Sequence, residues 1–415
     1  MVDLDGFCQL EETTVISSKQ LVAKTFATAS LLSWFFILTI NFEVLFQNIT
    51  TDKFWIFAGE ILFFIFAIAS ALIGVHISER FNRRKLLTLS ITLGILSILS
   101  LTIFHGETFS LLLGSLLGLS FGLGFPSAAA LFSDHTQEES RGKITGFFVL
   151  ITFTLITCGM FVSQVYSFLE LIIFSIVLSS LGYLSLTKDQ CSRENREVKT
   201  WFSILSRRNV RYYLIPWIIF NLVSGLSNFI YPGLPNEPMY ESAINIGTLT
   251  QFIGVAIFSI ISGFICDRFG RRLPIIIGVL LFGISFGILS VALDPLIIIF
   301  QSTIFGVAWG FCMVAYFVIP ADLAESESTL PEKYFALINI SSFVVYSGTM
   351  TLPIILGFSV PINILSPILS ILLFSSIIPL YSVSETLSET IRNSRKIRKH
   401  TESVVREVMK SKNEK

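Results

Sequence analysis

Long apolar stretches alternate with short polar segments along the whole chain. A helix that crosses a bilayer needs about 20 mostly apolar residues, and twelve stretches approach or exceed that length. Their apolar runs are continuous and lack the alternation of a membrane β-barrel. The pattern therefore predicts an all-α membrane protein with twelve transmembrane helices, at about residues 24–47, 54–77, 86–104, 109–133, 144–166, 168–187, 212–232, 243–265, 273–292, 295–320, 335–357 and 360–381.

Composition supports a lipid environment. Of the 415 residues, 53% are hydrophobic and 14% are charged, against about 25% charged in a typical soluble domain. The mean hydropathy is +0.74, which leaves too little polar surface to cover soluble domains. The 29 basic and 29 acidic residues cancel, so nothing in the net charge attracts nucleic acid. We expect the lipid bilayer to be a partner and nucleic acid not to be one.

Residues that serve metal, redox or hydrolytic chemistry are scattered. No two of the five Cys lie within four residues of each other, and the four His are equally dispersed. This spacing indicates no metal site and no redox motif. The chain also lacks a nucleophile elbow, an HExxH motif and a phosphate-binding loop. We therefore expect no cofactor, no metal and no enzymatic activity.

The basic residues lie almost entirely on one side of the predicted helices. Loops on cytoplasmic faces carry an excess of Lys and Arg. In one topology, both termini and the even-numbered loops lie on the same side of the membrane. The other side then contains a single basic residue, Lys53. This asymmetry predicts a multi-pass protein of the cell membrane with both termini in the cytoplasm.

One long polar stretch divides the twelve predicted helices into six and six. The tail after the last helix is basic on balance, with apolar residues that fit either a helix near anionic lipid or a solvated tail. The predicted organisation is a cytoplasmic segment 1–23, a bundle 24–187, a cytoplasmic linker 188–211, a second bundle 212–381 and a cytoplasmic basic tail 382–415.

The two predicted bundles repeat each other at a fixed offset. The segment that begins Glu79-Arg80 and ends in two Arg reappears as Asp267-Arg268, 188 positions later. The same offset relates Asp134 to Asp322 and two helical glycines to two others, Gly118 to Gly306 and Gly122 to Gly310. Small residues at this spacing allow close helix packing in lipid. Because six is an even number, the halves keep the same orientation and form a parallel repeat.

At these residues the chain resembles the major facilitator superfamily. Residues 263–272, Gly-Phe-Ile-Cys-Asp-Arg-Phe-Gly-Arg-Arg, fit the family's loop signature throughout, and the copy at residues 75–84 departs from it at three positions. The resemblance implies a membrane transporter with a twelve-helix fold of two bundles. It also implies that these loops lock the cytoplasmic side as a gate, whose candidate residues are Glu79, Arg80, Arg84, Asp134, Arg141, Asp267, Arg268, Arg272 and Asp322.

Two acids inside predicted spans are candidates for coupling. Ionisable residues within the membrane are costly and mark function by default. Glu43 lies near the outer end of the first predicted helix, and Glu60 lies about six residues into the second. Burial and a like-charged neighbour would both raise a carboxyl pKa. Glu60, with Glu43, is therefore a candidate proton or cation site, and the alternatives are an interfacial Glu43 and a static hydrogen bond at Glu60.

Polar residues on the first, seventh and eighth helices are candidate substrate contacts. In the family that the chain resembles, the first, fourth, seventh and tenth helices line a central cavity. Hydrogen bonding between helices is the competing interpretation. Trp309 and Tyr316 are seven residues apart on the tenth helix, where ordinary aromatic packing is the favoured interpretation. The substrate-binding candidates are Trp34, Asn41, Asn221, Ser224, Asn228 and Gln251.

These observations predict a secondary transporter that works by alternating access, in which two halves rock about a midplane site. No Lys or Arg lies well inside a span, so we expect a small neutral, cationic or amphipathic organic solute, with proton coupling left open. The expected assembly is a monomer, as is usual in the family. The alternative is a receptor with the same fold that signals through its cytoplasmic tail without moving a solute. Deleting the tail discriminates the two, because it should spare transport and abolish signalling.

Overall fold

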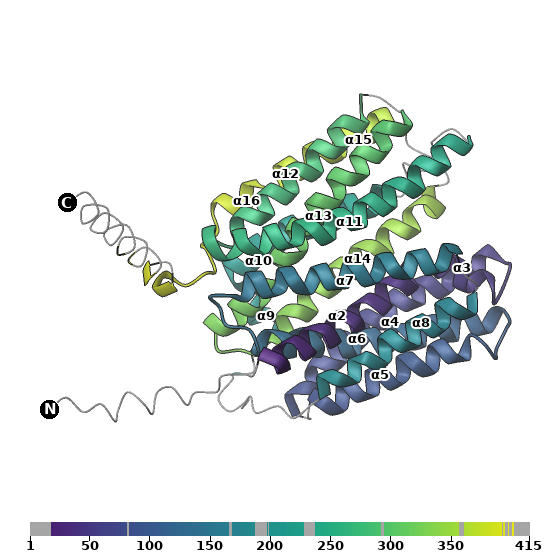
Figure 1. Cartoon of the computed structure of the whole chain (residues 1–415), viewed down its shortest axis with the longest axis horizontal. Helices are drawn as coiled ribbons and strands as arrows, with labels where there is room; N and C mark the ends of the chain where they lie inside the picture. The colour runs from purple at the N-terminus through teal and green to yellow at the C-terminus, as the bar shows by residue number, and fades with distance from the viewer. Residues whose placement is uncertain are drawn as a thin grey trace, which may run out of the picture.

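The chain folds into a bundle of long helices (Figure 1). The computed structural model describes residues 18–80, 83–165, 168–186, 197, 199–227, 237–291, 294–356, 361–391, 393, 394, 397 and 401. The elements are α2 Ser18–Ile40, α3 Phe42–Gln47, α4 Lys53–Arg80, α5 Arg83–Ser100, α6 Glu107–Asp134, α7 Arg141–Val165, α8 Phe168–Leu181, the 3₁₀ helix η1 Gly182–Leu186, α9 Trp201–Ser206, α10 Arg208–Leu226, α11 Pro238–Phe269, α12 Arg272–Leu289, α13 Pro295–Ser326, α14 Pro331–Leu356, α15 Ile362–Ser375 and α16 Ile378–Tyr381.

The helices follow the predicted spans closely. Each of the twelve stretches carries helix, and within the described ranges eight helices are long and apolar enough to cross a membrane. The first stretch is interrupted at Asn41, between α2 and α3, and the last is interrupted between α15 and α16. The all-α fold predicted from the hydrophobic pattern is confirmed.

The two halves of the chain pack side by side, with α2 to η1 in the N-terminal half and α10 to α16 in the C-terminal half (Figure 1). The repeated glycines form equivalent seams within the halves. A Cβ on Gly118 would lie 2.3 Å from the Phe63 carbonyl oxygen of α4, and a Cβ on Gly306 would lie 2.1 Å from the Gln251 carbonyl oxygen of α11. The backbones of α4 and α6, and of α11 and α13, therefore touch at sites where only glycine fits.

Two different seams join the halves to each other. Along α7 and α11 the residues are small: a Cβ on Gly263 would lie 2.5 Å from the Gly142 carbonyl oxygen, and the Ser259 hydroxyl donates to the Gly146 carbonyl at 3.0 Å. Along α4 and α14 the contact is aromatic, with the ring centroids of Phe64 and Phe343 5.5 Å apart. The halves thus meet through backbone on one side and through rings on the other.

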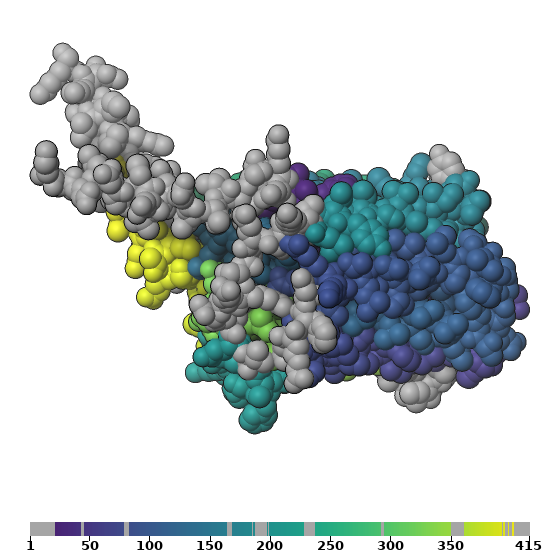
Figure 2. All heavy atoms as spheres, turned by 90° about the horizontal axis from the view of Figure 1, so that it is seen from below, coloured from purple at the N-terminus to yellow at the C-terminus, as the bar shows by residue number. Residues whose placement is uncertain are grey.

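The outer face of the bundle is apolar, as a lipid-facing surface requires. Figure 2 shows α5 and α8, in blue and teal, on one side of the N-terminal half. Leu89 and Leu96 of α5 are 50% and 60% exposed, and Ile173 and Val177 of α8 are 52% and 51% exposed. Exposed branched side chains on neighbouring helices fit acyl chains rather than water.

Candidate gate and central cavity

Ion pairs close one end of the bundle, which we call the gate end; here α2, α5, α7, α12 and α14 begin. The repeat places one pair in each half. Arg83 at the start of α5 contacts Asp134 at the end of α6, at 2.8 Å. Arg271, just before α12, contacts Asp322 near the end of α13, at 2.9 Å. Both members of one pair lie 188 positions from those of the other, so the two halves share this arrangement.

Other contacts at the gate end cross from one half to the other. Arg141, the first residue of α7, bridges Asp322 and Glu325 of α13, with 2.7 Å between its Nη2 and the Glu325 carboxylate. Arg83 also donates from Nε to Glu332 of α14 at 2.8 Å. We call these eight residues the gate network: Arg83, Asp134, Arg141, Asp267, Arg271, Asp322, Glu325 and Glu332.

Asp267 joins the halves through backbone donors. Its two carboxylate oxygens accept hydrogen bonds from the amides of Gly142 and Lys143, at 2.8 and 2.9 Å. These amides lie in the first turn of α7, where unpaired N–H groups and the helix dipole favour a negative charge. Arg271, four residues after Asp267, contacts the same carboxylate at 2.8 Å. One acid of the C-terminal half therefore caps a helix of the N-terminal half.

Arg271 lies at the centre of this network. Its side chain is fully buried and also donates to the Glu138 carbonyl oxygen of the N-terminal half at 2.7 Å. Burial has the largest single effect and lowers the pKa of this guanidinium, but the charges and hydrogen bonds of its neighbours, Asp322 foremost, together outweigh burial and hold the pKa above its ordinary value. Arg271 therefore stays charged at every pH at which the protein is folded.

The start of the predicted tail lies across the gate end. Glu385 accepts a hydrogen bond from the backbone amide of Arg271 at 2.6 Å, and the amide of Ser388 donates to the Glu138 carboxylate at 2.6 Å. Leu387 is only 3% exposed. Gly270 has φ +109°, and a Cβ there would lie 2.4 Å from Glu385, so glycine is required for this docking. Residues 385–388 thus contact both halves.

The structure corrects which arginines reach the acids. The predicted Arg268 is exposed and lies over the ring of its neighbour Phe269. The predicted Arg272 donates to the carbonyl oxygens of Leu380 and Val383, both at 3.3 Å, rather than to an acid. Arg84 is half-buried, and the side chains of Glu79 and Arg80 lie outside the described residues.

The arginines that contact the acids are instead Arg83 and Arg271, which directly precede the predicted Arg84 and Arg272. Both follow the first acid of the motif, Glu79 or Asp267, by four residues. On a helix this spacing places two side chains on the same face, so the sequence held a signal for these arginines. The predicted Asp134, Arg141, Asp267 and Asp322 all belong to the gate network. Among the described residues, no cluster of three His, Cys, Asp or Glu could hold a metal ion.

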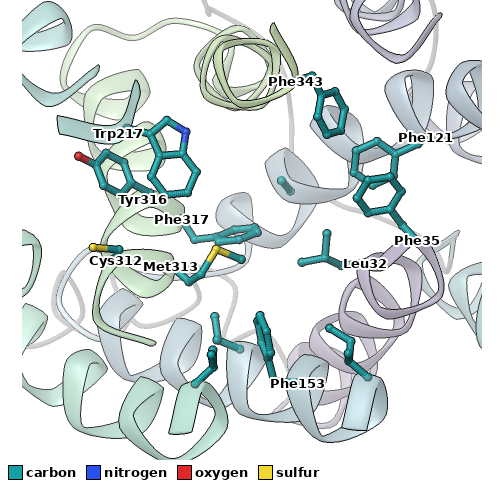
Figure 3. Packing of buried hydrophobic residues seen from close by; sticks show 14 of the residues in the cluster. Leu32, Phe35, Phe121, Phe153, Trp217, Cys312, Met313, Tyr316, Phe317 and Phe343 are labelled. Carbon is teal, nitrogen blue, oxygen red and sulfur yellow. The ribbon is translucent and has the colours of Figure 1, made fainter. Parts of the chain in front are cut away.

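A cavity of about 600 Å³ lies between the halves, beyond the gate network. Figure 3 shows rings from several helices facing one another there, with Phe35 and Phe121 stacked on one side and Trp217 and Tyr316 on the other. The lining comes from α2, α4, α6, α10, α13 and α14, and twelve of its twenty residues are aromatic. The lining residues are Leu32, Phe35, Phe36, Thr39, Ile40, Phe64, Phe121, Phe125, Trp217, Asn221, Trp309, Met313, Tyr316, Phe317, Phe335, Ile338, Asn339, Ser342, Phe343 and Tyr346.

Several polar groups of the lining are already bonded within the protein. Trp217 donates from its ring nitrogen to the Ile338 carbonyl oxygen at 3.1 Å. The Tyr316 hydroxyl donates to the Tyr213 carbonyl oxygen at 2.9 Å. Asn339 differs, because its side chain is buried and its Nδ2 has no hydrogen-bond partner. The twenty residues that line the cavity include none with a charge.

Of the predicted substrate residues, Asn221 lines the cavity, and its amide nitrogen donates to the Trp217 carbonyl oxygen at 2.7 Å. Ser224 is not among the lining residues, but its hydroxyl lies 3.0 Å from that of Tyr346, which does line the cavity. Trp309 and Tyr316 line it as well and also pack against Trp217.

Three of the remaining substrate candidates, Trp34, Asn41 and Gln251, are not among the residues that line the cavity. Trp34 is buried within its own half, with its ring near Gly94 of α5. Asn41 donates to the Ile37 carbonyl oxygen at 2.7 Å, at the break after α2. The backbone of Gln251 packs against Gly306. Asn228 lies outside the described residues. A local hydrogen bond accounts for the position of Asn41, and packing within one half accounts for those of Trp34 and Gln251.

Of the two coupling candidates, Glu60 is not among the residues that line the cavity. Glu60 is half-buried on α4, next to Gly59, at which α4 touches α6. Glu43 is in α3, but its side chain lies outside the described residues. The structure therefore brings Glu60 close to a seam within the N-terminal half and not into the cavity.

A helical bundle of two repeated halves, closed at one end around a central cavity, defines a multi-pass membrane transporter of the secondary class. Comparison with known proteins agrees. The model of the Major Facilitator Superfamily matches residues 25–347, and the chain belongs to that family; it is a transporter and not an enzyme. No curated protein sequence matches the chain.

A solved structure with the same fold is the proton:xylose symporter XylE bound to 6-bromo-6-deoxy-D-glucose. The TM-score is 0.70 at 13% sequence identity, and the match covers 88% of this chain and 96% of the symporter. At this identity the likeness establishes the fold alone. The predicted architecture of two six-helix bundles is thereby confirmed.

Proposed function

We propose that the chain moves a small organic molecule across the cell membrane by alternating access, with the gate end and both termini on the cytoplasmic side. The observations that carry the proposal are the central cavity between the halves and the ion pairs that cross from one half to the other at the gate end. Rocking of the halves would break these contacts and open the cavity on that side. The basic loops at the gate end support the orientation.

Access to the cavity from each side tests the proposal. Ser342 lies in the lining and is 8% exposed, so Ser342→Cys in a chain without other cysteines reports on access. The variant is reconstituted in vesicles of one orientation, and a membrane-impermeant thiol reagent is added from either side. We expect reaction from the outer side in the parent and from both sides when the gate network is weakened by Asp267→Asn. Reaction from a single side in both backgrounds would favour a receptor that does not alternate.

Proton coupling is a separate part of the proposal and rests on Glu60. The structural neighbour is a proton:xylose symporter, but here the lining offers no carboxylate, so a proton site would lie in the α4–α6 region. Once a solute is found by a transport screen, Glu60→Gln should remove the dependence of its uptake on a pH gradient. Glu107→Gln is the matched control, because Glu107 is an exposed acid at the start of α6. Unchanged pH-driven uptake in Glu60→Gln would show that Glu60 does not couple transport to protons.

A further inference from the structure

The cavity lining carries information on the chemistry of the solute. Its surface is formed mainly by aromatic rings. Polar groups are few in the lining, and several of them are already bonded within the protein. A polyol such as a sugar buries many hydroxyl groups, and each one needs a partner to avoid a desolvation cost. The described lining offers too few free partners for that. A mainly apolar molecule would instead replace water at surfaces that gain from its removal.

The absence of charged residues in the lining narrows the class of solute further. A buried ion needs an opposite charge, or it is strongly disfavoured. Aromatic faces attract cations, but this attraction alone is weaker than the hydration that an ion loses when it is buried against an uncharged lining. The cavity therefore favours a neutral molecule over the cation that the sequence left open.

One polar group in the lining lacks a partner within the protein. Asn339 of α14 is 8% exposed, and its Nδ2 donates no hydrogen bond. Buried donors are nearly always paired, so an amide left unpaired beside a cavity points to an acceptor on a ligand. Asn221, the other amide in the lining, donates from its nitrogen to the Trp217 carbonyl oxygen, so of the two amides Asn339 is the one whose nitrogen donates no bond within the protein.

We propose, on the basis of the proposed transport function, that the cavity takes a neutral, mainly aromatic molecule with one hydrogen-bond acceptor, such as a ketone or amide carbonyl, and that Asn339 donates to that acceptor. The aromatic walls supply most of the affinity. The single amide orients the molecule and distinguishes an acceptor-bearing molecule from a hydrocarbon of the same shape.

Benzophenone and diphenylmethane form a matched pair of probes for this site. Both consist of two phenyl rings joined by one carbon, which is a carbonyl in benzophenone and a methylene in diphenylmethane. Benzophenone also forms covalent adducts under ultraviolet light. The full chain in lipid nanodiscs is photolabelled over a range of benzophenone concentrations, and adducts are mapped by mass spectrometry. Diphenylmethane, tetraphenylphosphonium and xylose serve as competitors.

We expect saturable adducts on lining residues such as Met313 and Phe317, with benzophenone binding about tenfold more tightly than diphenylmethane, which corresponds to about 1.4 kcal/mol. Asn339→Leu should abolish this preference and leave the affinity for diphenylmethane unchanged. Ser341→Ala is the matched control on the same helix, because Ser341 is not among the lining residues and its hydroxyl donates to the Ile338 carbonyl oxygen at 2.7 Å. The comparison of the two probes on the unaltered chain needs no variant to fold.

Adducts confined to other surfaces, equal affinity for the two probes, or stronger competition by tetraphenylphosphonium or xylose would overturn the proposal. These outcomes are independent of transport, because binding is measured at equilibrium. The two experiments can fail separately. If benzophenone labels the cavity saturably but Ser342→Cys reacts from a single side in both backgrounds, alternating access is refuted and the proposed class of ligand is retained. If Ser342→Cys reacts from both sides when the gate network is weakened but benzophenone does not label the cavity saturably, the class of ligand is refuted and alternating access is retained.

Discussion

Replacing Asp267 with Asn weakens the contact at which the C-terminal half caps a helix of the N-terminal half. Asp267 accepts three hydrogen bonds, of which those from Gly142 and Lys143 cross between the halves. Asn is nearly the same size, but it has no charge and a single acceptor oxygen. The variant should therefore keep the packing of α11 and lose most of the attraction to the start of α7.

The magnitude follows from the bonds that cross. A hydrogen bond to a charged group contributes about 1.5–3 kcal/mol to stability. Since Asn retains one acceptor, we expect the closed gate to lose about 2 to 3 kcal/mol relative to the open one, a shift of about 30- to 150-fold in their ratio.

Cys266 is a natural reporter of that shift. It is fully buried where α11 meets Gly142 of α7, so a thiol reagent reaches it when the halves separate. With the other cysteines changed to Ala, the rate of Cys266 labelling should rise in proportion to the open population. Asp294→Asn is the matched control, because Asp294 caps α13 by accepting from Leu296 at 2.8 Å within its own half. The reasoning fails if Asp267→Asn leaves the rate unchanged or if the control raises it equally.

Two further changes at the gate end should be measured in the same way. Gly263→Ala places a Cβ 2.5 Å from the Gly142 carbonyl oxygen, so it should raise Cys266 labelling and lower the melting temperature by several degrees. Gly348→Ala is the control: its Cβ meets no atom within 4 Å, and Ala favours a helix over Gly, so labelling should stay unchanged and the melting temperature should not fall. Equal effects of the two variants would contradict this account of the seam. Glu385→Gln weakens a contact to Arg271 that lies within one half, so its effect on labelling should be a few-fold and smaller than that of Asp267→Asn. A larger effect would show that the tail segment, and not the capping of α7, holds the gate closed.

The sequence predicted the fold well because lipid imposes a simple rule on every helix. An apolar stretch long enough to cross the bilayer must be helical, and the repeat at 188 positions then relates the halves. The break at Asn41 was missed, because nothing in the hydrophobic pattern distinguishes a broken helix from a continuous one.

The site was predicted less completely, and the residues show why. Acids of the gate network such as Asp134 and Asp322 stood out because charge near a membrane border is conspicuous. Glu332 and Glu385 did not, because their roles depend on which distant segments the fold brings to Arg83 and Arg271. Asn339 was missed since a lone amide in an apolar stretch becomes informative only when its neighbours and its lack of a partner are known.

One of the contacts that cross at the gate end has no counterpart in the repeat. The pairs that repeat, Arg83–Asp134 and Arg271–Asp322, lie within halves. Arg141, which crosses to Asp322, corresponds to Thr329 at the same offset, so this crossing arginine, unlike Arg83 and Arg271, exists in one half alone.

Arg141→Thr, which makes the two halves more alike, should therefore weaken closure. Removing one member of a buried ion pair costs about 3–5 kcal/mol. Asp322 keeps Arg271 as a partner, and Glu325 is already 58% exposed, so we expect the lower limit, about 3 kcal/mol. The open population, measured by the rate of Cys266 labelling, should then rise about 150-fold. If labelling stayed at the parent rate, the repeated pairs and the cap on α7 would suffice to close the gate, and Arg141 would serve only to orient the chain in the membrane.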